Sequence, residues 1–222
     1  MQVSAIIPAF NEEKTIASTV MALRSIGGID EIIVVDDGSE DRTAELARKA
    51  GAIIFSLAEN CGKGQALEVG CAVSLGEILL LLDADLGETA KEAVVLLKPL
   101  MENEADISVA VFSLSDGKGG FGLVQGLSRW AISRSGGPRL AQPLSGQRAL
   151  PRHIWQKIGF KGGFGVETAL SMGIHRLGYH MVEVPVAMSH RRTSRDWRGM
   201  VHRGRQFVHV LLTIVRHWRW LI

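Results

Sequence analysis

Two carboxylates, Asp83 and Asp85, close the segment EILLLLDAD (77–85), whose four consecutive leucines indicate a buried strand. Side chains two residues apart on a strand point to the same side, so both carboxylates can reach one bound group. Mg²⁺ or Mn²⁺ takes only one or two protein carboxylates and completes its shell with water and phosphate oxygens. The D-x-D pair therefore predicts a divalent-cation site that also holds a diphosphate.

Polar side chains follow two further apolar segments. Asn11 and Glu12 come after VSAIIPAF (3–10), and Asp36 and Asp37 end EIIVVDD (31–37). One of these two aspartates could accept hydrogen bonds from a base or a ribose, or Asp37-Gly38 could be turn chemistry alone. In GKGQA (62–66), Lys63 stands between glycines at the start of a helical pattern, where a lysine and free backbone amides form a phosphate site.

Strands and helices alternate four times through the first 85 residues, with short connections. Buried strands are expected at 3–10, 31–37, 52–57 and 77–85, and helices at 11–25, 41–51 and 61–74. This alternation predicts an α/β fold with a mostly parallel sheet flanked by helices. Ligands of such sheets bind beyond the carboxyl ends of the strands, which is where the polar residues fall.

The pattern becomes less regular after Thr89. Helices are expected at 90–102, 123–133, 165–178 and 203–222, and strands at 106–112 and 180–188. The segment 135–147 is too polar for a core and too long for a simple turn, which is typical of a functional loop. With no internal repeat or low-complexity linker, we expect one domain, 1–222, made of two halves, 1–88 and 89–190, and a basic helical tail (191–222).

Composition excludes several classes of protein. The 222 residues are 46% hydrophobic and 22% charged, as in a globular domain with a substantial core. The two cysteines, Cys61 and Cys71, form neither a disulfide framework nor a zinc motif. The start MQVSAIIPAF has no basic region or cleavage site of a signal peptide, and no apolar run reaches the ~18 residues of a membrane span. These features predict a cytoplasmic protein.

Four segments, in this order and spacing, carry a resemblance to a known family: IIPAFNEEKTI, EIIVVDDGSEDRT, NCGKGQALEVG and ILLLLDADL. They look like the nucleotide-sugar half of glycosyltransferase family 2, whose Rossmann-like fold is called GT-A, and the resemblance covers nearly the whole chain. Three further stretches, GKGQAL, PLSGQRAL (143–150) and GFGVETAL (163–170) followed by SHRR (189–192), look most like the glucosyl-3-phosphoglycerate synthases. Polyprenyl-phosphate sugar transferases of the dolichol-phosphate type share the first half and are the alternative.

The resemblance implies a role for each matching position. The donor, UDP-glucose or another nucleotide sugar, would be bound by Pro8, Ala9, Phe10, Glu12, Asp36, Asp37, Lys63, Asp83, Ala84, Arg191 and Arg192. The metal ion, Mg²⁺ or Mn²⁺, would be held by Asp85 and His190. The acceptor, a small anionic or phosphorylated molecule, would be held by Gly136, Gly137, Ser145, Gly146 and Glu167.

Asp83 and Glu167 are the expected catalytic residues. Transfer of a hexose requires stabilisation of the charge on the departing diphosphate, which a metal ion, Lys63 and arginines can supply. Glu167 could take the proton of the acceptor hydroxyl, or be a first-turn carboxylate favoured only by the helix dipole. Should the reaction retain the anomeric configuration, as in the phosphoglycerate synthases, Glu167 would position the acceptor instead. The loop 136–143 is compressed relative to those synthases, which leaves the acceptor open.

Two other classes fit the sequence less well. A nucleotidyltransferase shares the acidic strand ends, but it typically carries a glycine-rich basic loop after the first strand, where this chain has AFNEEK. A nucleotide-sugar binding module without activity has no need of the D-x-D pair, Lys63 and His190 together. We therefore expect an enzyme, a nucleotide-sugar hexosyltransferase.

The last 34 residues are strongly basic. They contain eight arginines and one acid, Asp196, which gives +7 in a chain of net charge +2 and leaves −5 for the remainder. Three of the five tryptophans, Trp197, Trp218 and Trp220, also lie here, beside an apolar stripe in the expected helix 203–222. This pattern predicts a homodimer interface or a helix that packs on the sheet, with peripheral contact to an anionic membrane as the alternative. Nucleic acid is not expected as a partner, because the tryptophans belong to an apolar stripe rather than a stacking platform.

Overall fold

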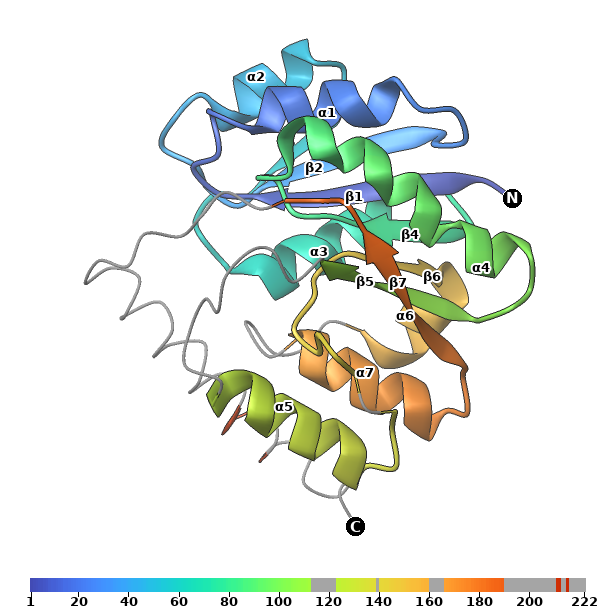
Figure 1. Ribbon diagram of the computed structural model, residues 1–222. Helices are drawn as coiled ribbons and strands as arrows, with labels where there is room; N and C mark the ends of the chain where they lie inside the picture. Colours follow the sequence, from blue (N-terminus) through green and yellow to red (C-terminus); the bar gives the residue numbers. More distant parts are fainter. Residues whose placement is uncertain (113–122, 139, 160–165, 190–210, 213–214, 216–222) are drawn as a thin grey trace.

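The computed structural model describes residues 1–112, 123–138, 140–159, 166–189, 211–212 and 215. Seven strands form one sheet in the order β3-β2-β1-β4-β6-β5-β7 (Figure 1). Their bounds are β1 Val3–Ala9, β2 Glu31–Asp36, β3 Ile53–Ser56, β4 Ile78–Leu81, β5 Ile107–Phe112, β6 Arg148–Pro151 and β7 Met181–Val186. All neighbouring strands are parallel except β6, which pairs antiparallel with both β4 and β5. The predicted mixed, mostly parallel α/β sheet is confirmed.

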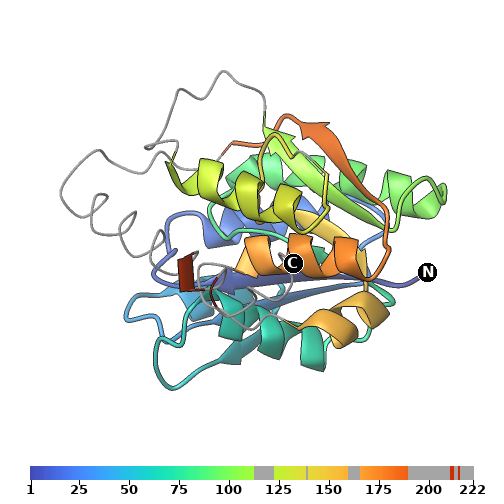
Figure 2. The same ribbon diagram turned by 90° about the horizontal axis from the view of Figure 1, so that it is seen from below.

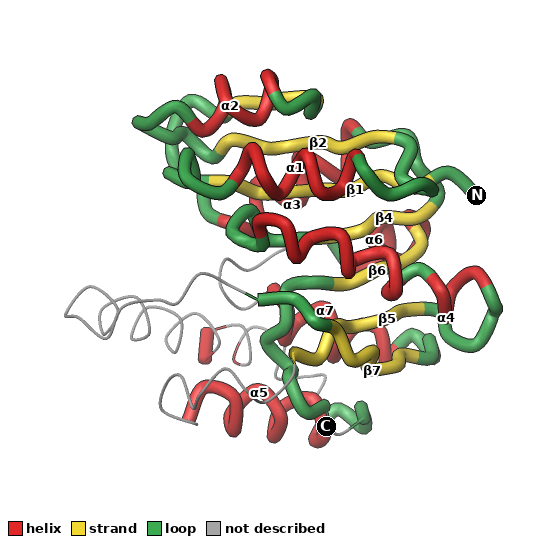
Figure 3. Tube along the Cα trace, turned by 45° about the horizontal axis from the view of Figure 1, so that its top comes forward, coloured by secondary structure: helices red, strands yellow, loops and turns green. Residues whose placement is uncertain are grey.

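Helices cover both faces of the sheet (Figure 3). One face carries α1 (Ile16–Arg24), α2 (Thr43–Lys49), the 3-10 helix η1 (Gly87–Leu96) and α4 (Lys98–Met101). The other face carries α3 (Lys63–Val73), α5 (Leu123–Arg134), α6 (Arg152–Ile158) and α7 (Val166–Arg176). The helices α5 and α7 lie side by side, joined by a hydrogen bond of 2.8 Å between the buried hydroxyls of Ser128 and Thr168 (Figure 2).

The predicted helix 90–102 is divided in the structure. A 3-10 helix ends at Leu96, and a short α-helix with Pro99 in its first turn follows. Proline has no N–H to donate, and its ring clashes with the carbonyl four residues earlier, so one continuous α-helix cannot pass through Pro99.

The switch point of the sheet lies between β1 and β4. The chain builds β1, β2 and β3 outward on one side, then returns to place β4 on the other side of β1. The loops that follow β1 and β4 therefore leave the same edge in opposite directions and open a crevice there. Loops after β1 and β2 are also tied together, because Asn11 Oδ1 accepts the Glu40 N–H at 2.9 Å and Ser39 Oγ accepts the Asn11 N–H at 2.9 Å.

The short strand β6 was not expected from the sequence. Its register places Arg148 beside Leu81, the last residue of β4. Because the two strands run antiparallel, the residues just before β6 lie next to those just after β4. The segment 145–147 is thereby brought to Asp83, the first aspartate of the D-x-D pair.

Most of the basic tail is outside the described residues. Leu211, Leu212 and Val215 are helical and exposed, and the dimer and membrane contacts expected of this segment stay predictions. Within the described part of the chain, no helix is long and apolar enough to cross a membrane.

Candidate active site

A cavity of about 340 Å³ opens at the switch point between β1 and β4. Its described lining comes from the ends of β1, β2 and β4 and from the start of α3. The lining residues are Pro8, Ala9, Phe10, Glu12, Asp37, Asn60, Gly62, Lys63, Asp83, Ala84 and Asp85. Nine of these eleven positions are ones for which the sequence predicts donor or metal binding. The structure thus brings together residues from four separate segments.

Asp37 shapes the wall of this donor cavity. Its two carboxylate oxygens accept the N–H groups of Cys61 and Gly62, both at 2.8 Å. Gly38 has φ +73°, and a Cβ there would stand 2.8 Å from the backbone of Glu59, so only glycine fits. The loop before α3 is therefore packed against the end of β2, which fixes the position of Lys63.

Asp36 is placed differently from Asp37. It is buried, its Oδ1 accepts the Ser39 N–H at 3.2 Å, and it is not among the described residues that line the cavity. Asp36 thus supports the turn after β2. Because successive side chains of a strand point to opposite faces, Asp36 and Asp37 face different sides, and a donor contact of Asp36 stays a prediction.

The D-x-D residues follow β4 in a turn rather than extending the strand. The turn is held by Thr19 of α1, whose buried hydroxyl donates to the Ala84 carbonyl at 2.9 Å and accepts the Gly87 N–H at 2.8 Å. Asp83 and Asp85 both line the donor cavity. No cluster of three or more potential metal-ligating side chains occurs among the described residues. The two carboxylates of Asp83 and Asp85 fit a site in which one or both hold Mg²⁺ or Mn²⁺, with phosphate oxygens completing the coordination shell.

Lys63 lies at the centre of the charged groups. Its Nζ is 2.8 Å from Asp83 Oδ1 and 3.0 Å from Glu167 Oε1. Burial alone lowers the pKa of Lys63, but the two carboxylates outweigh that effect and raise the pKa above its ordinary value. The ammonium group therefore stays charged at any pH at which the enzyme works, and it can face a phosphate.

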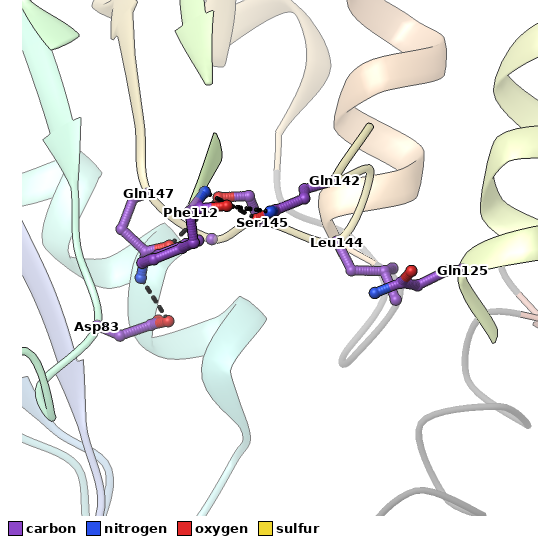
Figure 4. Close-up of a pocket in the computed structure, with 8 residues that line it drawn as sticks. Asp83, Phe112, Gln125, Gln142, Leu144, Ser145 and Gln147 are labelled. Atoms are coloured by element: carbon purple, nitrogen blue, oxygen red, sulfur yellow. Dashed lines mark hydrogen bonds between the residues drawn. The ribbon is translucent and has the colours of Figure 1, made fainter. Parts of the chain in front are cut away.

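A second cavity, of about 200 Å³, adjoins the first (Figure 4). Asp83 lines both cavities. On the second side, Asp83 Oδ2 accepts a hydrogen bond of 2.6 Å from the Gln147 amide, as Figure 4 shows. The remaining lining residues are Phe112, Gln125, Gln142, Leu144, Ser145 and Gly146. A sugar carried on a diphosphate in the first cavity can thus meet an acceptor in the second at Asp83.

Ser145 and Gly146 lie where an acceptor contact was expected, in the wall of the second cavity. A Cβ on Gly146 would stand 2.4 Å from Lys63 Nζ and 3.2 Å from Asp83 Oδ1. Any larger side chain here would push the lysine and aspartate apart, so the charged centre depends on this glycine.

Glu167 reaches the site through Lys63. It lies in the first turn of α7, its side chain is 12% exposed, and it is absent from the described lining of both cavities. Its carboxylate contacts Lys63 Nζ at 3.0 Å. This arrangement favours a role for Glu167 in holding Lys63 over removal of the acceptor proton.

Gly136 and Gly137 depart from the prediction. A Cβ on Gly136 would stand 3.0 Å from His175 Nε2, and one on Gly137 would stand 2.8 Å from Ile132 Cγ2. His175 is in the last turn of α7, eight residues or roughly 12 Å along the helix from Glu167. These glycines therefore allow the turn after α5 to pack on α7, and the structure does not place them with Ser145 and Gly146. His190, Arg191 and Arg192 lie outside the described residues.

Several residues at the site were not predicted. Asn60 and Gly62 line the first cavity, Phe112, Gln125, Gln142, Leu144 and Gln147 line the second, and Thr19 and Arg148 support the walls. Some of their contacts join distant residues, such as Gln147 and Asp83, which are 64 residues apart. Asn60 and Gly62 lie in the segment NCGKGQALEVG, and Leu144, Gln147 and Arg148 lie in PLSGQRAL.

The model of glycosyl transferase family 2 matches residues 4–151 of this sequence, which is more than half of the chain. The chain belongs to this family. The family match contains both carboxylates of the D-x-D pair and Lys63, and it ends with β6. It therefore covers the donor cavity and the loop that lines the second cavity, whereas Glu167 lies beyond it.

Several relatives of this family 2 glycosyltransferase are glucosyl-3-phosphoglycerate synthases. The one from Mycolicibacterium smegmatis is 31% identical across 95% of this chain and 77% of its own length. The structure of the Mycobacterium tuberculosis synthase with Mn²⁺, UDP and glucosyl-3-phosphoglycerate superposes with a TM-score of 0.81 at 27% identity, covering 97% of this chain and 79% of that one. An undecaprenyl-phosphate 4-deoxy-4-formamido-L-arabinose transferase of Pectobacterium carotovorum is 40% identical, but over only 40% of this chain.

Proposed function

We propose that this family 2 glycosyltransferase moves glucose from UDP-glucose to a small anionic acceptor of the 3-phosphoglycerate class, with Mg²⁺ or Mn²⁺. The observation that carries the proposal is the meeting of two cavities at Asp83, with Lys63 bound to that carboxylate. One cavity has the acidic turn and the helix start suited to a metal-bound diphosphate. The other is lined by amide and hydroxyl groups suited to a polar acceptor.

The choice of donor and acceptor is supported by the relatives. The Mycobacterium tuberculosis synthase has been solved with Mn²⁺, UDP-glucose and phosphoglyceric acid, and it superposes on 97% of this chain with a TM-score of 0.79. The identity to that structure is 29%. The similarity to the undecaprenyl-phosphate enzyme is confined to less than half of the chain, so a polyprenyl-phosphate acceptor is the second candidate.

Each residue has a task in this mechanism. Asp85 would hold the divalent cation, which when bound neutralises charge on the diphosphate. Lys63 adds a fixed positive charge beside the departing phosphate oxygens, where charge develops during transfer. Asp83 accepts hydrogen bonds from the sugar while Gln147 holds its other oxygen. Glu167 keeps Lys63 in place. With Glu167 in that role, the proton of the acceptor hydroxyl would pass to the departing diphosphate oxygen, which suits a reaction that retains the anomeric configuration.

Nucleotide binding tests the donor half of the proposal. Melting temperatures would be measured with UDP, UDP-glucose and GDP-mannose, with and without Mn²⁺, for the wild type, Asp85→Ala and Glu88→Ala. A ligand at 100 times its Kd stabilises the native state by about 2.7 kcal/mol. We expect UDP-glucose to raise the melting temperature only with Mn²⁺. Asp85→Ala should lose this rise, and the exposed neighbour Glu88→Ala should keep it.

Transfer assays then test the acceptor half. 3-Phosphoglycerate, glycerol 3-phosphate and a polyprenyl phosphate in detergent would each be offered with UDP-glucose. A product with 3-phosphoglycerate supports the proposal. Transfer to the polyprenyl phosphate alone would assign the second candidate, and no response to any nucleotide would contradict donor binding itself.

A further inference from the structure

Arg148 is a charged side chain buried in the interior beside the site. It begins β6, pairs in the sheet with Leu81 of β4 and Val109 of β5, and is 1% exposed. It is among the largest fully buried side chains of the described chain, in a position where an apolar residue is the usual choice. None of the tasks described above for the transfer reaction uses it.

The guanidinium group of Arg148 joins two separate walls of the site. Its Nε donates to the Ser145 carbonyl at 3.0 Å, and its Nη2 donates to the Pro143 carbonyl at 3.2 Å. On the other side, Nη1 donates to Ser171 Oγ at 2.9 Å, and Nη2 donates to the Glu167 carbonyl at 3.2 Å. The first pair belongs to the loop that lines the second cavity. The second pair belongs to α7, which carries Glu167 to Lys63.

Burying the charge of Arg148 costs free energy of solvation, so good packing alone does not explain why an arginine stands at this position. The groups that accept its hydrogen bonds are neutral carbonyls and a hydroxyl, and burial lowers the pKa of Arg148 to about 10 although Glu167 and Glu183 offset part of the effect. Apolar residues of similar volume often replace buried charges with no loss of stability. What an apolar side chain cannot do is hold four acceptors from two segments in one plane, as the rigid guanidinium fork does.

We propose that Arg148 is a positioning residue for the acceptor: it fixes the loop 143–147 against the first turns of α7 and thereby sets the shape of the second cavity. The acceptor part of this inference rests on the proposed function. Arg148 binds the wall of the second cavity directly, through the carbonyls of Pro143 and Ser145, but reaches the donor cavity only indirectly, through Glu167 and its ion pair with Lys63. Loss of the guanidinium should therefore weaken acceptor binding far more than donor binding.

Arg152 offers a matched control. It follows the end of β6, as the first residue of α6, and its guanidinium also binds backbone carbonyls: that of Gly76 at 2.8 Å and that of Cys71 at 3.0 Å. These groups surround the beginning of β4, whereas the site lies beyond its end. Arg148 and Arg152 thus both bind backbone carbonyls through a guanidinium group, Arg148 near the end of β4 and Arg152 near its beginning.

Steady-state kinetics of Arg148→Met, Arg148→Lys and Arg152→Met would separate the two roles, with UDP-glucose and 3-phosphoglycerate as substrates. We expect Arg148→Met to raise the acceptor KM at least about tenfold, since small displacements in a site cost one to two orders of magnitude. The donor KM should stay within about twofold. Arg148→Lys keeps the charge but not the fork, so it should not restore the acceptor KM. Arg152→Met should lower the melting temperature and leave both KM values unchanged.

Amide hydrogen exchange gives a readout that does not depend on activity. In Arg148→Met, or in Arg148→Lys should the methionine variant not fold, exchange should rise in 144–147 and in the first turns of α7, with β1 and α3 unchanged. In Arg152→Met the rise should fall on 71–76 instead. Should the wild type transfer glucose to no acceptor while this exchange pattern is observed, the proposed function fails and the positioning role stands. Uniform exchange changes in Arg148→Met, or an equal rise of donor and acceptor KM, would overturn the inference.

Discussion

Lys63 is the residue on which the charged centre depends. It contacts Asp83, which lines both cavities, and Glu167, which comes from a helix 104 residues later in the chain. Sequence reasoning could identify the lysine, because glycine-flanked lysine at a helix start is a recognisable phosphate site. It could not identify Glu167 as the partner of Lys63, since a contact across 104 residues depends on the packing of α7, which no local pattern records. Residue types were thus predictable here, and pairings were not.

Replacing Lys63 by methionine should abolish transfer and lower stability. Loss of a charge aimed at the departing diphosphate should reduce kcat by at least about 10²-fold. Two carboxylates would lose their shared cation, so we expect the free energy of unfolding to fall by about 1–3 kcal/mol at pH 7, as measured by urea denaturation. Lys49→Met, which removes only an exposed pair with Glu45, should change stability by less than about 1 kcal/mol.

The sign of the pH dependence follows from the raised pKa of Lys63. A group whose pKa is higher in the folded state stabilises it fully below the unfolded pKa, about 10.4 for lysine. The difference in unfolding free energy between wild type and Lys63→Met should therefore be constant from pH 7 to pH 9. It should decrease only as the pH rises past the unfolded value. A difference that shrinks between pH 7 and pH 9 would mean that Lys63 is not held by its two carboxylates.

Among the elements, the strands of the first half were the easiest to predict. Their apolar runs are continuous because both faces of β1, β2 and β4 are covered. The strand β6 was missed because its sequence, RALP, begins with an arginine and ends with a proline, so no apolar run marks it, and its antiparallel direction is set by the return of the chain from α5. The acceptor side of the site depends on β6, which explains why Ser145 and Gly146 could be placed only by resemblance and Gln147 not at all.

The helix α3 shows how closely one element must approach the sheet to bring Lys63 to the site. A Cβ on Gly70 would stand 2.4 Å from Ile6 Cγ2 and 3.1 Å from Val35 Cγ2. We expect Gly70→Ala to lower the free energy of unfolding by about 1–3 kcal/mol, as overpacked cores do. In α5, a Cβ on Gly126 meets no described atom within 4 Å. Gly126→Ala should instead stabilise the protein by about 0.5–1 kcal/mol, the usual helix preference for alanine.

Chemical denaturation of both variants measures this difference directly. An equal response of the two glycines would show that intrinsic helix preference decides at both positions and that α3 does not press against β1. Because Gly70 is seven residues from Lys63, a shift of α3 should also reduce the binding of UDP-glucose by Gly70→Ala. Gly126 lies in α5, which contributes no described residue to the donor cavity, so Gly126→Ala should leave the binding of UDP-glucose unchanged.

At the scale of the whole molecule, the two halves expected from the sequence share both cores. The core on the α1 side contains Val3 and Leu23 from the first half and Leu96, Ala149 and Val186 from the second. The other core joins Ile6 and Leu67 to Ile107, Leu150 and Leu170. The boundary near residue 88 is therefore not one of packing, and the pairing of β4 with β6 crosses it. The division into a donor half and an acceptor half stays a prediction.

Shared cores predict a single cooperative unfolding transition. All five tryptophans are at position 130 or later, and Trp155 is buried against Glu68 of α3, so their fluorescence reports the second half and its contact with the first. Far-UV circular dichroism reports the helices and strands of both halves. We expect the two urea transitions to coincide in midpoint and slope, because neither half can lose its packing without exposing apolar surface of the other. A fluorescence transition at lower urea than the dichroism transition would mean that the second half unfolds first. The first half would then stay folded at intermediate urea concentrations, and binding of UDP at those concentrations would show whether the donor site is still formed.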